Sequence, residues 1–442
     1  MKTSNSDRTK ALGKGNIFLD SFKTKSINKL SYLCGYTKRQ GGKIQPKSLI
    51  VGFMLMISKR RNTYSDWAFE VGLLENKTIT KQSLNAKMTQ QTEDLVKQVL
   101  EENLLARVKP KPSKKINGLL KNFNSVQIDD SSTLHLPDEL AEKFPGNYSR
   151  GEKKALAKVH ALYNLTENNF SFLKVYSFTN NDQSLSPSVL PYLEKGDLCI
   201  RDLGFLVLDV LEQMMEKDIY FISRKNYQIK ILDTQTEEQI NLAQVLRKKK
   251  KFDKEVIIGK KQKLKMRLIA IPIPATQANE RKRKARMDRD QRLNHSKDYY
   301  ELLGYAIYIT NINPEKVKAD EIDQLYRLRW NIEIIFKSWK SYFFFEKLIH
   351  RQCTNEFRVK CMIYLMLIYI TMFHKILQQV ERIYKELKIS ILKMASFFVK
   401  YFQFLFQQKI SANMYNQIVV HCAYDKRNDR RNAKETWLKL LN

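Results

Sequence analysis

The chain has few cysteines and few histidines for its length. Its 442 residues include five cysteines, scattered without any C-x-x-C pair, and six histidines that are equally dispersed. This pattern argues against a disulfide framework and against a zinc site. We therefore expect reduced cysteines with a structural role, and any metal site would have to be built from carboxylates.

Long apolar runs are also absent. The longest, Leu49 to Ile57 and Cys361 to Phe373, fall short of the roughly 20 residues that a membrane-spanning helix needs. Residues Met1 to Asn16 are polar and basic, without the apolar centre of a signal peptide. We expect buried helices at the two apolar runs, no membrane association, and a cytoplasmic protein.

Acidic residues are in short supply relative to basic ones. The chain carries 78 Lys and Arg against 46 Asp and Glu, a net charge of +32. Such a chain should bind polyanions, with an affinity that falls as salt rises. Charge alone does not separate DNA from RNA or from an anionic membrane surface.

The excess is concentrated between residues 241 and 290, which hold 17 basic and 5 acidic residues. A basic run within this segment comprises Arg281, Lys282, Arg283 and Lys284. We predict an inserted β-rich unit that lies along DNA, the alternative being a solvated loop.

The periodicity of the sequence divides the chain. Helices are predicted at 47–58, at 64–74 and from residue 80. The short turn between the last two helices is compatible with a helix-turn-helix that reads DNA and equally with a plain helical bundle. A linker is expected at 107–115. Strands and helices then alternate, which predicts a mixed α/β sheet with carboxylates at strand ends. The strands are expected at 126–130, 155–165, 170–178, 198–202, 219–223, 255–258 and 264–272, and the helices at 188–194 and 205–216.

A stripe of functional side chains is predicted on one helix over residues 326–340. At about 100° per residue its members fall within roughly 60° of one another. They are Tyr326, Arg329, Glu333 and Lys340. A separate apolar face holds Leu328, Ile332, Ile335 and Trp339, and we expect Trp330 in the core as well. The stripe is either an ordinary solvated charge face or, with a metal on the carboxylate, a site for a phosphodiester.

The spacing of the stripe is that of a Y-x2-R-x3-E-x6-K signature. Two further segments precede it in order: Val126 to Pro137, with Asp130 near its centre, and Leu198 to Phe205, with an Asp-x-Gly-aromatic motif from Asp202. From about Phe123 to His350 the chain therefore resembles the Y-R-E-K group of bacterial insertion-sequence transposases with a DDE catalytic core.

This resemblance implies a fold and a division of the chain. The fold is α/β, a ribonuclease-H-like mixed sheet core interrupted by a β-rich insertion and flanked by helical regions at both ends. The implied parts are a DNA-binding helical region at 1–116, the core at 117–224 and 305–350, the basic β-rich insertion at 225–304, and a helical region at 351–442 that helps two subunits pair.

The resemblance also implies a site and its ligands. Asp130, Asp202 and Glu333 would be catalytic and would hold two Mg²⁺ ions, with Mn²⁺ as an alternative ion. Tyr326, Arg329, Lys337 and Lys340 would hold double-stranded DNA, together with the basic run at 281–284. The DNA would be the element's terminal inverted repeats and the target, and the protein would act as a homodimer.

The sequence leaves two points open. Alternation along the strand puts Asp129 and Asp130 on opposite faces and does not choose between them, whereas the family's spacing to Leu136-Pro137 selects Asp130. Some family members stack a flipped base on a tryptophan of the insertion. This chain has none there, so that role either falls to another aromatic, Phe221 or Tyr227, or is absent, and a hairpin intermediate stays open. His160 is interpreted as structural.

Overall fold

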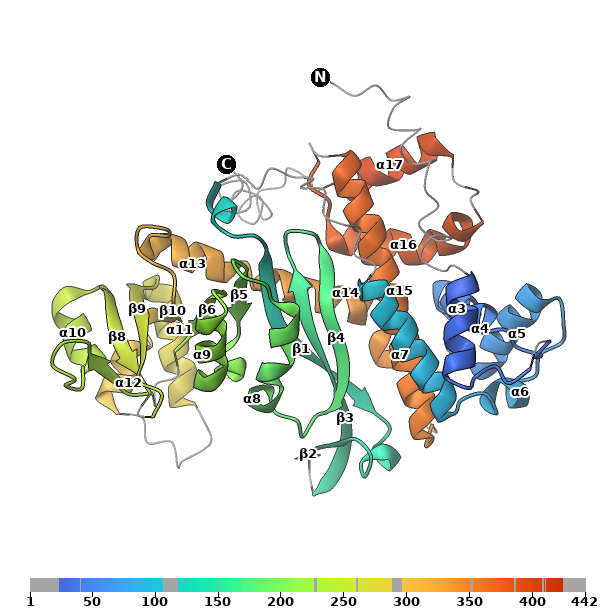
Figure 1. The fold of residues 1–442 in the computed structure, drawn as a ribbon, viewed down its shortest axis with the longest axis horizontal. Coiled ribbons are helices and arrows are strands. Elements are labelled where there is room, and N and C mark those ends of the chain that lie inside the picture. The colour runs from blue at the N-terminus through green and yellow to red at the C-terminus, as the bar shows by residue number, and fades with distance from the viewer. Residues whose placement is uncertain are drawn as a thin grey trace.

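A ten-stranded sheet runs through the middle of the molecule, with a helical body beside it (Figure 1). The computed structural model describes residues 24–39, 41–105, 118–149, 151–225, 229–259, 261–287, 296–350, 353–384, 387–407, 409 and 411–423. The strands are β1 (Val126–Leu136), β2 (Pro145–Ser149), β3 (Glu152–Asn164), β4 (Asn169–Ser177), β5 (Leu198–Arg201), β6 (Tyr220–Arg224), β7 (Ile231–Asp233), β8 (Phe252–Ile258), β9 (Leu264–Pro272) and β10 (Tyr305–Thr310).

The first part of the sheet has the order β4-β3-β1-β5-β6. The strand β3 is antiparallel to both β1 and β4, while β5 is parallel to both β1 and β6. Three antiparallel strands followed by two parallel ones form the ribonuclease-H-like core that the sequence predicted, so the predicted fold class is confirmed.

The strands between residues 225 and 304 continue this sheet. β10 pairs with β6 on one side and with β9 on the other, and β9, β8 and β7 follow outward. The strands predicted at 255–258 and 264–272 are present as β8 and β9. Because β10 covers the edge of β6, the β-rich segment is tied into the core by backbone hydrogen bonds.

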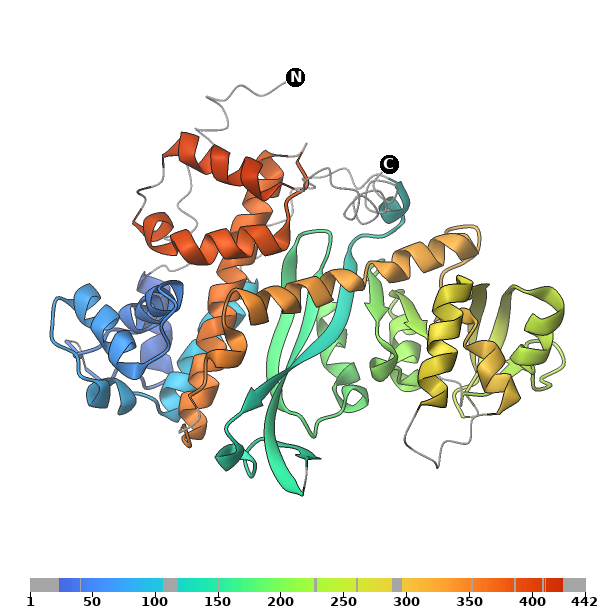
Figure 2. The same ribbon diagram turned by 180° about the vertical axis from the view of Figure 1, so that it is seen from behind.

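Helices cover the two faces of the sheet. One face carries α8 (Asp182–Leu185) and α9 (Leu208–Glu216), and Figure 2 shows α13 (Ala319–Arg327) and α14 (Trp330–Ser341) across the other. The helix predicted at 188–194 is a 3₁₀ turn, Ser186–Tyr192, because Pro191 inside it has no backbone N–H for a regular α-helical hydrogen bond. The helix α11 (Ala275–Arg286) lies on the second face (Figure 2). The helices α10 (Leu242–Lys249) and α12 (Lys297–Leu302) pack against each other, and Leu246 and Leu302 join the apolar cluster of α9.

The prediction of one continuous helix over 326–340 is wrong. The chain forms α13 and α14, joined at residues 328 and 329 by hydrogen bonds of the i→i−3 type, as from Arg329 N to Tyr326 O. The helix α13 packs on β6 and β9, while α14 packs on β1. Since a sheet twists from strand to strand, one straight helix would not follow both regions, and the tighter turn changes the direction of the axis.

The helical body is formed by both ends of the chain. It contains α3 (Thr24–Leu33), α4 (Pro46–Ser58), α5 (Tyr64–Glu75), α6 (Lys81–Asn85), α7 (Gln90–Leu105), α15 (Glu356–Ile383), α16 (Ile391–Phe406) and α17 (Ala412–Cys422). The helices predicted at 47–58 and 64–74 are confirmed. The predicted linker at 107–115 lies outside the described residues.

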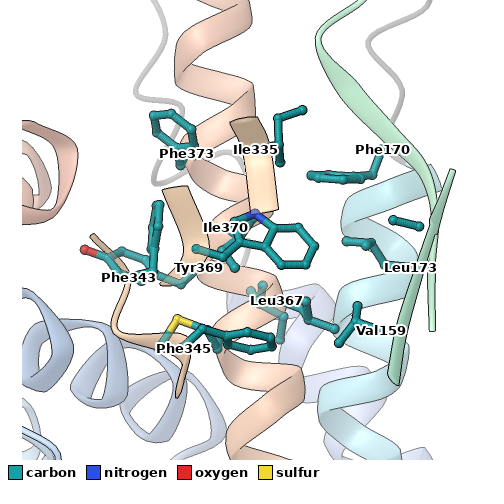
Figure 3. Packing of buried hydrophobic residues seen from close by; sticks show 14 of the residues in the cluster. Val159, Phe170, Leu173, Ile335, Phe343, Phe345, Leu367, Tyr369, Ile370 and Phe373 are labelled. Carbon is teal, nitrogen blue, oxygen red and sulfur yellow. The ribbon is translucent and has the colours of Figure 1, made fainter. Parts of the chain in front are cut away.

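One apolar core joins this body to the sheet. Figure 3 shows Phe170 of β4, Ile335 of α14 and Phe373 of α15 packed in the same cluster. The helix α15 has the length and hydropathy of a membrane span, but most of it is buried in this core. Such burial is typical of a central helix of a water-soluble fold, so α15 does not indicate a membrane protein.

Candidate active site

Three carboxylates come together from three distant segments. Asp130 lies in β1, Asp202 follows the last residue of β5, and Glu333 lies on the first turn of α14. The strands β1 and β5 are parallel neighbours, with Asp129 opposite Arg201. Their next residues, Asp130 and Asp202, are therefore brought side by side. Asp202 follows the end of β5, whereas β1 continues to Leu136, so the prediction that this strand ends at residue 130 is wrong.

Arg329 stands between these carboxylates. Its Nη1 donates to Asp130 Oδ2 at 2.7 Å, its Nη2 donates to Glu333 Oε1 at 2.6 Å, and its Nε lies 3.8 Å from Asp202 Oδ1. The planar guanidinium suits this role because it presents several donors in one fork. One cation thus faces all three predicted catalytic residues.

The two neighbouring aspartates have opposite environments. Asp130 is mostly buried, and this burial raises the pKa of its carboxyl to about 6 although Arg329 opposes the shift. Asp129 is fully buried on the other face, where it accepts hydrogen bonds from Arg201. Burial raises its pKa, but the charges of Arg201 and His160 hold it below its usual value.

Tyr326 is less exposed to solvent than its predicted role in contacting DNA requires. It is buried, its ring lies 5.0 Å from that of Tyr308, and the Arg224 guanidinium sits 5.3 Å above it. Burial raises the pKa of Tyr326 to about 12. Its hydroxyl and Arg329 Nε make no hydrogen bond of good geometry within the described residues. Arg224, at the end of β6, is a cation of this site that the sequence pattern did not reveal.

The other predicted DNA-binding lysines lie further from the carboxylates. Lys340 is two turns beyond Glu333 on α14 and pairs with Glu346 at 3.2 Å. Lys337 is exposed, one turn beyond Glu333. The basic run at 281–284 lies on α11, where Arg281 donates to Tyr305 O and Arg283 pairs with Glu280. Figure 2 shows α11 on the same face of the sheet as α13 and α14.

A glycine is required at position 204, two residues after Asp202, because the backbone there lies very close to Asp182. A Cβ on Gly204 would meet Asp182 Oδ2 at 2.8 Å. Asp182 has little freedom to move, since its Oδ1 accepts from Lys158 Nζ at 2.8 Å and from Ser131 Oγ at 3.1 Å. Asp182 and Lys158 therefore support the segment around Asp202. No sequence pattern pointed to either residue, because only the fold brings them here.

The aromatic residues differ from expectation. Trp339 is fully buried as predicted, but Trp330 is 65% exposed, so the prediction that Trp330 lies in the core is wrong. Trp330 follows Arg329 directly, at the start of α14. The opposite face of this helix packs on β1. Phe221 is fully buried and is not open to a DNA base, and Tyr227 lies outside the described residues.

The three carboxylates have the right chemistry for a hard divalent ion. They offer only oxygen donors, which Mg²⁺ and related ions prefer, and they already surround one positive charge. As they stand, no three acidic, histidine or cysteine side chains in the described part of the chain are arranged to hold a metal. A bound ion would therefore take the place of the Arg329 guanidinium between Asp130, Asp202 and Glu333.

Comparison with known sequences agrees with this geometry. The profile of the family described as transposase DDE domain matches residues 121–372, which include all three carboxylates. The chain belongs to this family. Membership implies dependence on a divalent metal ion.

Insertion-sequence transposases are among the relatives of this DDE-domain chain. It is 30% identical over 268 residues to the transposase for insertion sequence element IS231F of Bacillus thuringiensis subsp. israelensis, covering 56% of this chain and 55% of the relative. It is 32% identical over 265 residues to that for IS231B of subsp. berliner, covering 55% of each. The match thus spans about half the length of these relatives.

Two further similarities cover more of the DDE-domain chain. The transposase for insertion sequence element IS1151 of Clostridium perfringens is 25% identical over 354 residues, 73% of this chain and 72% of that protein. Among solved structures, the piggyBac transposase synaptic complex with hairpin DNA has a TM-score of 0.45 at 9% identity, covering 96% of this chain and 85% of that one.

Proposed function

We propose that this DDE-domain chain is an insertion-sequence transposase of the Y-R-E-K group. It would bind the terminal inverted repeats of its element, hydrolyse a strand at each end and join the 3′ hydroxyl to target DNA. Asp130, Asp202 and Glu333 would hold two Mg²⁺ ions, or Mn²⁺. The observation that carries this proposal is the convergence of the three carboxylates on Arg329.

The residues around the carboxylates would handle the phosphodiester. Bound divalent ions would neutralise the phosphate and favour deprotonation of the attacking oxygen. Released from its carboxylates, the Arg329 fork would turn to two phosphate oxygens, which a guanidinium binds well. Tyr326 and Lys340 would hold the DNA on either side, with Lys340 acting as a point charge.

The choice of Asp130 as the first catalytic aspartate is supported by its surroundings. Asp130 faces Arg329 and through it Glu333. Asp129 is fully buried on the opposite face and both of its carboxylate oxygens are occupied. A DNA phosphate would have no access to Asp129.

The DNA would extend from the carboxylates to the basic helix α11. Both lie on the same face of the sheet (Figure 2), and the exposed cations of α11 outnumber its one acidic residue. In the N-terminal region we propose a second contact through α6, where Lys81 and Gln82 are exposed. Binding through both should weaken steeply as salt rises.

Pairing of two subunits through the C-terminal helices is supported by their surface. Phe404 on α16 and Met414 and Val420 on α17 are exposed apolar side chains. We propose that they meet a second copy of the chain in a complex that holds both element ends, in the bacterial cytoplasm and at the nucleoid. The boundaries at 116, 224, 304 and 350 belong to the same proposal.

The decisive experiment combines the chain with a duplex of the element's end, a target plasmid and Mg²⁺. We expect cleavage and joining by the wild type, and binding without either reaction by Asp202→Asn and Glu333→Gln. The measurements are strand cleavage on a denaturing gel and joined product by sequencing of the junctions. Wild-type cleavage rates in either variant would contradict the proposed site.

The same experiment separates the rival functions. Cleavage that produces free ends and never a joined product would identify a metal-dependent nuclease. Binding of the end duplex by a wild type that neither cuts nor joins would identify a DNA-binding protein derived from a transposase.

A further inference from the structure

A buried ionic cluster lies on the opposite face of the sheet from the proposed active site. Asp129 Oδ2 accepts hydrogen bonds from Arg201 Nε at 2.9 Å and from Arg201 Nη2 at 2.7 Å. The other carboxylate oxygen of Asp129 lies 2.6 Å from His160 Nε2. All three side chains are fully buried. We call Asp129, Arg201 and His160 the clasp.

The clasp joins the two strands that carry the predicted aspartates. Asp129 and Arg201 are register partners in the parallel pair of β1 and β5. The residue after each is a predicted metal ligand, Asp130 or Asp202. Successive residues of extended chain point to opposite faces, and Asp202 keeps an extended backbone with φ −71° and ψ 161°. Fixing Asp129 and Arg201 on one face therefore fixes the direction of Asp130 and Asp202 on the other.

The clasp also holds the segment that follows Asp202. Arg201 Nη2 donates a further hydrogen bond to Ser186 O at 2.9 Å. The ring of Phe205 stacks on that of His160, with 5.0 Å between their centroids. The turn after Asp202 is thus clamped between this ring stack and the close contact of Gly204 with Asp182.

Stability alone does not account for this arrangement. A buried ion pair is often no more stabilising than apolar side chains of the same shape. What the Arg201 guanidinium provides beyond apolar packing is direction, since its Nε and Nη2 must both meet one oxygen of Asp129.

We propose that Asp129 and Arg201 are positioning residues, which hold Asp130 and Asp202 at the separation at which both bind one divalent ion. This inference rests on the proposed function. Partners behind metal ligands typically change metal affinity by about 10- to 100-fold when they are altered. Loss of the clasp should therefore appear in metal binding itself, before any DNA is cut.

The test is Mn²⁺ binding to the full chain, measured as the loss of the free-ion signal in electron paramagnetic resonance. The variants are Asp129→Asn and Arg201→Lys, which keep size and, in the second, charge. The matched control is Asp253→Asn. It breaks another Arg–Asp pair of the same sheet, in which Arg267 donates to the two carboxylate oxygens of Asp253 at 2.7 and 2.8 Å between β8 and β9.

We expect Mn²⁺ affinity to fall at least about tenfold in both clasp variants and to stay within about twofold in the control. Thermal unfolding measured in parallel shows which variants are folded. If Asp129→Asn does not fold, the titration of Arg201→Lys decides. Folded clasp variants that bind Mn²⁺ as tightly as the wild type would overturn the inference.

A further variant separates this failure from failure of the proposed function. Asp202→Asn removes a proposed ligand and should weaken Mn²⁺ binding more than either clasp variant. Unchanged binding in Asp202→Asn would overturn the metal site and the clasp together. Weakened binding in Asp202→Asn with unchanged binding in Arg201→Lys would overturn the clasp alone.

Discussion

Arg329 Nη1 donates to Asp130 Oδ2 at 2.7 Å, across 199 residues of sequence. This one hydrogen bond joins the first strand of the sheet to the helix that carries Glu333. The positive charge at the centre of the carboxylates is thus a side chain of the protein. It balances their charges in the free chain and would compete with a divalent ion at the proposed site.

Removing this side chain should make folding depend on metal. In Arg329→Ala, Asp130, Asp202 and Glu333 would repel one another without compensation, and we expect a loss of about 1–3 kcal/mol of unfolding free energy. Added Mn²⁺ should restore more of the melting temperature in this variant than it adds to the wild type. Differential scanning calorimetry with and without Mn²⁺ measures both effects. Equal metal-induced shifts in the two proteins would contradict the proposed competition.

The two tryptophans of α14 should respond oppositely to replacement by alanine. Trp339 is fully buried, packed against Phe336 and Phe345, so Trp339→Ala should cost about 3–5 kcal/mol of stability. Trp330 is exposed, and Trp330→Ala should change stability by less than about 0.5 kcal/mol.

If Trp330 contacts the DNA end, Trp330→Ala should instead weaken binding of an end duplex by about 1–3 kcal/mol, the usual range for base stacking. Denaturant unfolding and fluorescence anisotropy measure the two quantities. End binding unchanged by Trp330→Ala would remove Trp330 from the DNA contacts.

Gly204 and Asp182 should be energetically coupled. Gly204→Ala brings a Cβ to 2.8 Å from Asp182 Oδ2, and we expect it to lose about 1–3 kcal/mol through overpacking. The double variant Gly204→Ala/Asp182→Ala should lose less than the sum of the single variants, because Asp182→Ala removes the clashing oxygen. A double-mutant cycle by chemical denaturation measures the coupling, and strict additivity would show that the contact is not the reason for the glycine.

The contribution of His374 to stability should fall on mild acidification, while the raised pKa of Asp130 acts in the opposite direction. Burial lowers the pKa of His374 to about 3, against a usual value of 6.5. Between these values the unfolded chain binds a proton that the folded chain excludes. His374 therefore removes about 1.4 kcal/mol of stability per pH unit as the pH falls below 6.5. Urea unfolding at pH 5 and 7 should show a smaller pH dependence in His374→Gln. An unchanged dependence would mean that other groups cause it.

The basic helix α11 should contribute to the salt dependence of DNA binding. Each lysine that contacts a phosphate adds about 0.9 to the slope of log affinity against log salt. Lys282→Ala/Lys284→Ala should lower that slope by up to about 2. A matched control is Lys263→Ala, which removes an exposed lysine paired with Glu237. Equal slopes for the double variant and the wild type would place α11 outside the DNA contacts.

The local sequence pattern was sufficient to predict many of the strands and helices of this fold. Strand alternation and turn residues located β1, β5, β8 and β9, and helical periodicity located α4 and α5. The placement of Asp202 directly after a strand also followed from the sequence, since it depends only on neighbouring residues. The strand of Asp130 was predicted too short, because β1 continues to Leu136. The net charge depends on composition alone and needs no structure.

The tertiary structure decided what depends on neighbours far apart in the chain. Alternation put Asp129 and Asp130 on opposite faces, but only the packing of Arg201 and His160 shows which face is closed. Trp330 and Trp339 have the same chemistry, and the direction of α14 relative to β1 exposes one and buries the other.

The remaining differences have the same physical cause. The break between α13 and α14 at residues 328 and 329 follows the twist of the sheet. The sequence of the helices does not encode that twist. Asp182 and Lys158 meet the segment around Asp202 only because the strands bring them together. In each case, residue type and spacing determined what chemistry was available, and burial in the folded chain determined which residues were free to use it.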